Sequence, residues 1–273
     1  MLKITLAERF TYRSHAGQVK RDMFNFLKNA QESDIKFDGR FEKNFDVTID
    51  GESYRVVLSV MKERPAGRVL TKGYYFPKEK KVIVKVYLPR DFFTSKEYHL
   101  QQLKRLLNHV VYHEFEHYLQ YNTPGTNLYG DHLTFGDKYG KLHPIFEPVY
   151  KDEFYTKENI KDYRYFTKPH EISAFLRSIF SFKTDNKSSY ARAFEFFENN
   201  YTGGLNRELT VKLNLALLMY MQQRFPERYN KEKDLDVLKQ TLLKRINRFH
   251  EEARKNPKYK DKLRPIDLNI NRG

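Results

Sequence analysis

The sequence lacks cysteine and lacks any long hydrophobic run. With no Cys among 273 residues, disulfide bonds, thiolate metal ligands and a cysteine nucleophile are excluded. Any metal must therefore be bound by His, Asp or Glu. The stretch Met1–Phe10 has no apolar segment of signal-peptide length, and no later window approaches the roughly 18 apolar residues of a membrane span. We expect a cytoplasmic protein that makes no membrane contact.

Positive charge is abundant but dispersed along the chain. The sequence has 50 Lys and Arg against 35 Asp and Glu, a formal net charge of +15. A nucleic-acid groove favours clustered basic residues, whereas the basic groups at 78–85 and 244–264 are separate and often mixed with acids. We expect a solvated basic surface on which nucleic-acid binding is weak and nonspecific.

Apolar periodicity predicts an α+β fold in which a small sheet precedes a long helix and a helical C-terminal layer. The alternating sequence FDVTIDGESYRVVLSV predicts two antiparallel strands, near 45–49 and 53–60, joined by a tight turn at Asp50-Gly51. Two further runs, Arg68–Phe76 and Val82–Leu88, have the β-branched and aromatic content of strands. Helical spacing predicts helices at 18–30, from a cap at Thr94 to about 121, and at 169–182, 188–200, 206–224 and 231–255.

The organisation predicted from these elements is a core at 1–182 followed by a helical subdomain at 183–273. The sheet in this core is small and of mixed or antiparallel type, and it packs on the long central helix. Between Asn122 and Thr167 the pattern dissolves into Gly, Pro, Asp and Tyr, which indicates a long loop with one short helix at most.

The central helix contains the motif His113-Glu114-Phe115-Glu116-His117. Residues four apart project from one face of a helix, so both imidazoles can bind one tetrahedral zinc ion. Glu114 lies on the neighbouring face, where it is placed to act as the general base. The spacing predicts a Zn²⁺ site on this helix.

The position of Glu114 on the helix supports this reading. It projects into the middle of the apolar stripe formed by residues such as Leu103, Leu107 and Val110. Burying a carboxylate among leucines is costly unless a charged or hydrogen-bonding group meets it. A metal centre would provide such a partner, whereas Glu116 and Gln120 fall on the polar side of the helix and need none.

A third ligand is needed, because catalytic zinc takes three protein ligands and leaves one position open. The residues after His117 supply no close histidine. Within TKPHEISAFLRSIFSF, Glu171 projects to the same side as Phe175 and Ile179, whereas His170 points away. Glu171 is the preferred ligand, and His132 and His143 are the reserve candidates.

The motif HEFEH, followed by a Pro-x-Glu-Ile-x-Ala-Phe segment, resembles the gluzincin group of zincin metallopeptidases and the ImmA/IrrE-like and phage-encoded peptidases. The resemblance implies His113, His117 and Glu171 as ligands and Glu114 as base. It also implies a polypeptide substrate that lies antiparallel to an edge strand, either Arg68–Phe76 or Val82–Leu88. Candidates for stabilising the transition state are Tyr163, Arg164, Tyr165, His132 and His143.

The predicted function is hydrolysis of peptide bonds in a protein substrate by a zinc metallopeptidase. Two alternatives remain open at this stage. One is a phage virion or structural protein that keeps a zincin fold and makes assembly contacts through its C-terminal helices, and the location would then be the virion. The other is a basic nucleic-acid-associated protein whose peptidase is accessory.

Overall fold

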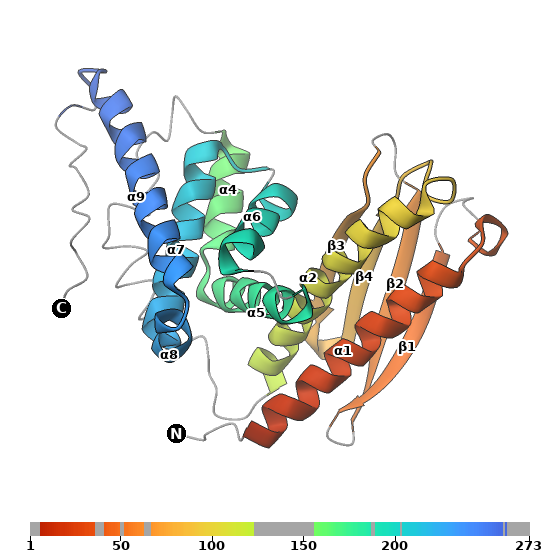
Figure 1. Cartoon of the computed structure of the whole chain (residues 1–273). Helices are drawn as coiled ribbons and strands as arrows, with labels where there is room; N and C mark the ends of the chain where they lie inside the picture. The colour runs from red at the N-terminus through yellow and green to blue at the C-terminus, as the bar shows by residue number, and fades with distance from the viewer. Residues whose placement is uncertain are drawn as a thin grey trace. The chain divides into compact units, whose positions relative to one another are not determined.

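The chain forms two compact units, residues 1–127 and 128–273, which are described separately (Figure 1). The computed structural model describes residues 6–35, 41–49, 52–62, 67–122, 156–186, 189–202, 204–258 and 260. The predicted division by function, with a core at 1–182 and a subdomain at 183–273, is a different division and stays a prediction. The predicted hairpin turn at Asp50-Gly51 and most of the predicted loop lie outside the described residues.

The first unit contains a mixed four-stranded sheet. Its strands are β1 (Phe41–Ile49), β2 (Glu52–Lys62), β3 (Leu70–Phe76) and β4 (Lys81–Leu88), in the order β1-β2-β4-β3. The pairs β1–β2 and β3–β4 are antiparallel, whereas β2 and β4 are parallel. This mixed sheet, followed by helices, confirms the α+β class.

Two long helices accompany the sheet (Figure 1). They are α1 (Leu6–Asn29) and α2 (Lys96–Asn122). Contacts join α2 to β3 and to α1. Tyr118 of α2 packs edge-on against Tyr54 of β2 and Tyr75 of β3, with ring centroids 4.5 and 6.2 Å apart. The helix that carries the motif therefore lies against the sheet.

The start of α2 differs from the predicted cap. The first helical hydrogen bond runs from the His99 amide to the Ser95 carbonyl, at 3.3 Å, which places Ser95 at the cap position. The Thr94 hydroxyl instead donates to the carbonyl of Asp91, at 3.0 Å. The capping prediction at Thr94 is wrong because a preceding turn, from Asp91 to Ser95, engages that hydroxyl.

The described residues of the second unit are helical. The predicted C-terminal helices appear as α5, α6, α7 and α9, and α4 is the short helix within the predicted loop. The helices are α4 (Lys157–Phe166), α5 (Pro169–Asn186), α6 (Tyr190–Tyr201), α7 (Arg207–Arg224), α8 (Pro226–Asn230) and α9 (Lys233–Arg254). Among the described residues, no helix has the length and apolar composition needed to cross a lipid bilayer.

Helix α7 runs through the core of the second unit, and every residue from 208 to 221 is buried. Two of these residues are charged. The Lys212 side chain is 0% exposed, and its Nζ lies 2.8 Å from Oε1 of Glu208, one helical turn earlier. The amide of Asn214, also buried, donates to Glu198 of α6 at 3.0 Å. The ammonium group of Lys212 and the side-chain amide nitrogen of Asn214 thus have partners inside the helical unit.

Candidate metal site

Helix α2 buries the three motif residues that the sequence singles out. His113 is 8% exposed and Glu114 is 5% exposed, and His117 is partly buried. The flanking residues Val110 and Phe115 are also buried. The prediction that Glu114 projects into the apolar side of the helix is therefore confirmed.

The two histidines face each other through the same ring nitrogen. Their Nε2 atoms are 3.2 Å apart, and the ring planes are nearly perpendicular, at 89°. Two nitrogens that bind one tetrahedral zinc at about 2.0–2.1 Å lie roughly 3.3–3.4 Å from each other. The spacing between His113 and His117 is therefore close to that of a shared metal ligand pair.

Gln120 fixes the orientation of the second histidine. Its Oε1 lies 2.9 Å from Nδ1 of His117. Because a carbonyl oxygen only accepts, this contact places the proton on Nδ1 and leaves the lone pair of Nε2 directed toward His113. Gln120 is 3% exposed, so its assignment to a solvated polar side is wrong. A residue three positions after a histidine in a helix lies on the same face. The spacing between His117 and Gln120 could therefore have identified Gln120 as a partner of His117.

The Glu114 carboxylate lies beside the same pair and against the backbone of β3. Its Oε1 is 4.0 Å from Nε2 of His113. At Gly73 of β3, an added Cβ would lie 2.6 Å from the Glu114 Cδ. The carboxyl group thus occupies space that a side chain at Gly73 would fill. A glycine inside a predicted strand signals such a close approach, but the sequence alone did not identify which group approaches.

Strand β3 forms one edge of the sheet, since among the described residues it pairs only with β4. Strand β4 pairs with β2 on one side and with β3 on the other. Of the two strands proposed to receive a substrate, Val82–Leu88 is therefore excluded because both its sides are occupied. The run Arg68–Phe76, which contains β3, has the edge required for β-addition.

Glu171 lies in the first turn of α5 and is 3% exposed. The Nε2 atom of His170 is 3.6 Å from Oε1 of Glu171. His113, His117 and Glu171 form a group that could hold a metal ion. The three residues that were predicted as ligands are the members of this group.

The other predicted site residues have different surroundings. Tyr163 of α4 is buried in the core of the second unit. Burial raises the pKa of its phenol well above the ordinary value, and the nearby charge of Glu208 raises it further. Tyr165 is 46% exposed, and Nζ of Lys168 lies 5.6 Å from its ring centroid. The roles suggested for these tyrosines stay predictions.

The remaining candidates for stabilising a transition state are Arg164, His132 and His143. Arg164 is exposed in the last turn of α4. His132 and His143 lie outside the described residues. Their role in stabilising a transition state stays a prediction.

His109, one helical turn before His113, was not singled out from the sequence. It is 0% exposed, and burial holds its pKa well below the ordinary value of 6.5, with a smaller lowering from His113. A neutral imidazole at this position adds no positive charge beside the ligand pair. The recurrence of histidine every four residues, at 109, 113 and 117, was the signal for a continuous histidine face.

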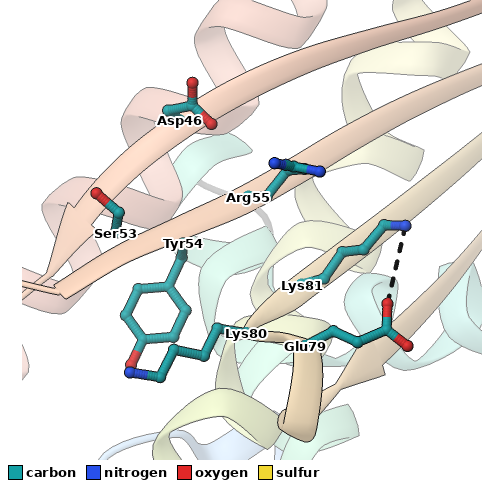
Figure 2. A pocket seen from close by; sticks show the side chains of 7 residues that line it. All are labelled: Asp46, Ser53, Tyr54, Arg55, Glu79, Lys80 and Lys81. Carbon is teal, nitrogen blue, oxygen red and sulfur yellow. Dashed lines mark ion pairs between the residues drawn. The ribbon is translucent and has the colours of Figure 1, made fainter.

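A hollow of about 470 Å³ lies elsewhere in the first unit, around the turn between β3 and β4 (Figure 2). It is lined by Asp46, Ser53, Tyr54, Arg55, Glu79, Lys80 and Lys81. Nζ of Lys81 is 4.0 Å from Oε2 of Glu79. Two acidic and three basic side chains line the hollow, so its net charge is small and gives little selectivity for an ionic ligand of one sign.

Comparison with protein-family models, with curated proteins and with solved structures gives no match for this chain.

Proposed function

We propose that the chain is a zinc-dependent peptidase whose ligands are His113, His117 and Glu171 and whose general base is Glu114. The observation that carries this proposal is the 3.2 Å approach of the His113 and His117 Nε2 atoms, with the Glu114 carboxylate beside them. Two imidazoles, one buried and one partly buried, that point the same nitrogen at each other are stabilised by a cation between them. Their convergence supports a metal ion bound between them.

The donor set supports zinc as that metal. Two imidazole nitrogens and one carboxylate oxygen are the ligands of the His₂Glu class of catalytic zinc site, which leaves one position open. The sequence has no thiolate to offer a softer metal. The Gln120 contact with His117 supplies the outer hydrogen bond that zinc-binding histidines usually have.

When bound, zinc supplies Lewis acidity, which polarises a carbonyl and makes water a stronger nucleophile near neutral pH. Glu114 would accept a proton from the attacking water and deliver it to the leaving amine. Its burial, at 5% exposure, limits competition from bulk water for that proton. The buried Gln120 amide would keep the His117 ring from rotating during turnover.

The open edge of β3 supports an extended polypeptide as the substrate. A strand that adds to β3 would run past Gly73, and Gly73 is the β3 residue that faces Glu114. The backbone of such a strand would lie beside the proposed base. This arrangement favours hydrolysis of a peptide bond over reactions of small, compact substrates, and it supports a relationship to the zincin peptidases.

Metal analysis of the purified, dialysed chain tests the first half of the proposal. We expect about one zinc per chain, as for a single catalytic site. The variants His113→Ala and His117→Ala should lose it, whereas His15→Ala, a histidine of α1 outside the group, should keep it. Full retention of zinc by both motif variants would refute the site.

Peptide hydrolysis tests the second half. A peptide library incubated with the zinc-loaded chain and read by mass spectrometry should show cleavage. Glu114→Gln should retain metal and fold but cleave more slowly by roughly 10²–10⁴-fold, because an amide cannot accept the proton. Equal cleavage by both proteins would exclude Glu114 as the base.

A further inference from the structure

We infer that Gly73 is a positioning residue for Glu114, and that the absence of a side chain at this point of β3 sets where the carboxylate lies. The inference rests on the proposed role of Glu114 as base. Gly73 would not touch substrate through a side chain of its own. It would act by leaving room for the group that does.

The pleat of β3 aims position 73 at α2. Side chains two residues apart in a strand share a face, and Tyr75 uses that face to pack against Tyr118 of α2. Position 73 is therefore on the helix side of the sheet, where it pairs in register with Val84 of β4. The Glu114 side chain fills the volume that the next side chain of this face would take.

Glycine at this position carries a structural cost. Inside a strand it weakens the sheet, because it offers no side chain for packing and loses more backbone freedom on folding than other residues. The neighbouring positions of β3 and β4 are occupied by larger residues, among them Tyr74, Tyr75 and Val84. The close approach of Glu114 explains why a glycine occupies this position.

The carboxyl group would be displaced by even the smallest side chain at position 73. A Cβ there would lie 2.6 Å from the Glu114 Cδ, well inside van der Waals contact. The backbone of Glu114 is held within α2 between the buried residues His113 and Phe115. The side chain is flexible and the helix is not, so Gly73→Ala should change the Glu114 rotamer and leave the fold intact.

Such a displacement should affect turnover more than metal binding. A misplacement of about 1 Å at a catalytic group can lower the rate by roughly 100-fold. Gly73→Ala should therefore lower kcat on a cleaved peptide by about that factor, with the zinc content unchanged and KM altered much less. The matched control is Gly67→Ala, since a Cβ at Gly67 meets nothing within 4 Å.

A second measurement needs neither metal nor substrate. Thermal unfolding of the wild type, Gly73→Ala, Glu114→Ala and the double variant forms a double-mutant cycle. In the Glu114→Ala background the new methyl group enters vacated space. The change from Gly73 to Ala should therefore be more favourable there than in the wild type, by a few degrees in Tm.

The two measurements separate the inference from the proposed function. Equal Tm shifts in both backgrounds, or a kcat for Gly73→Ala equal to that of Gly67→Ala, would overturn the positioning role. Unequal Tm shifts in the two backgrounds, together with no zinc binding by the wild type, would support the contact between Gly73 and Glu114. The same result would reject the proposed peptidase function. Coupling together with zinc binding and the loss in kcat is the expected result.

Discussion

Helices α2 and α7 both bury acidic and basic side chains, but they resolve the cost of burial in different ways. In α7, the ammonium group of Lys212 and the carboxylate of Glu208 lie 2.8 Å apart and neutralise each other. In α2, the groups that converge are alike, since two imidazole Nε2 atoms approach to 3.2 Å. Opposite charges form a structural pair, whereas two imidazole nitrogens at this distance can share a hydrogen bond or bind one metal ion.

This difference shows what a buried charge can and cannot indicate. A carboxylate on an apolar helix face is expensive, and that reasoning singles out Glu114 and Glu208 equally. Lys212, one turn after Glu208, provides a partner of opposite charge and explains the second case. Burial identifies a place that needs explanation, and the chemical identity of the neighbouring atoms decides between structure and function.

The largest effect, on the free energy of unfolding, is expected when the Glu208–Lys212 pair of α7 is disrupted. Lys212→Ala would leave the Glu208 carboxylate buried beside a vacant space and should lower the free energy of unfolding by about 3–5 kcal/mol. Urea denaturation followed by circular dichroism measures this loss. Replacing both residues, as Glu208→Leu with Lys212→Met, should recover most of it. A loss below about 1 kcal/mol for Lys212→Ala, the range of an exposed pair, would show that the pair is solvated.

The next prediction compares the contributions of Glu171 and His170, at the start of α5, to zinc binding. Glu171→Ala removes a proposed ligand and should weaken zinc binding by more than roughly 100-fold, whereas His170→Ala removes a neighbour and should weaken it by roughly 10-fold. Competition with a chromophoric chelator measures both constants. The reverse ranking would make His170 the ligand and would leave the His113–His117 pair in place.

The last prediction concerns the hydrogen bond between Gln120 and His117. Gln120→Leu keeps the size of the side chain but removes the acceptor for Nδ1, and it should weaken zinc binding by roughly 10–100-fold. The control is Gln101→Leu, the same change at an exposed position of α2. If both variants bind zinc equally well, the contact between Gln120 and His117 has no part in metal binding.

Much of the fold could be predicted because local patterns determine it. Alternating residues identified β1 and β2, and β-branched and aromatic content identified β3 and β4. Helical spacing identified α2, α5 and α7. The strand order could not be predicted in the same way. The parallel pairing of β2 with β4, which places β3 at the edge, depends on contacts between distant segments.

The three members of the candidate metal-binding group could be predicted from the sequence, whereas the neighbouring residues Gln120 and Gly73 could not. His113, His117 and Glu171 have a distinctive chemistry and a spacing that places them on helix faces. Gln120 and Gly73 have neither: an amide near a helix end is usually solvated, and a strand glycine is compatible with many contacts. Their importance depends on which atoms lie within a few ångströms, and only the coordinates supply this.

The open edge of β3 that would receive a substrate is also open to another copy of the same strand. An unpaired edge is a template for aggregation, and Tyr74 and Phe76 on β3 are 39% and 37% exposed, so they would add apolar contact. Lys72, on the same strand, is exposed and places a positive charge at that edge. With a net charge of +15, two copies repel each other at low ionic strength. The dispersed basic charge would thus protect a peptide-binding edge from self-association, and high salt would weaken that protection.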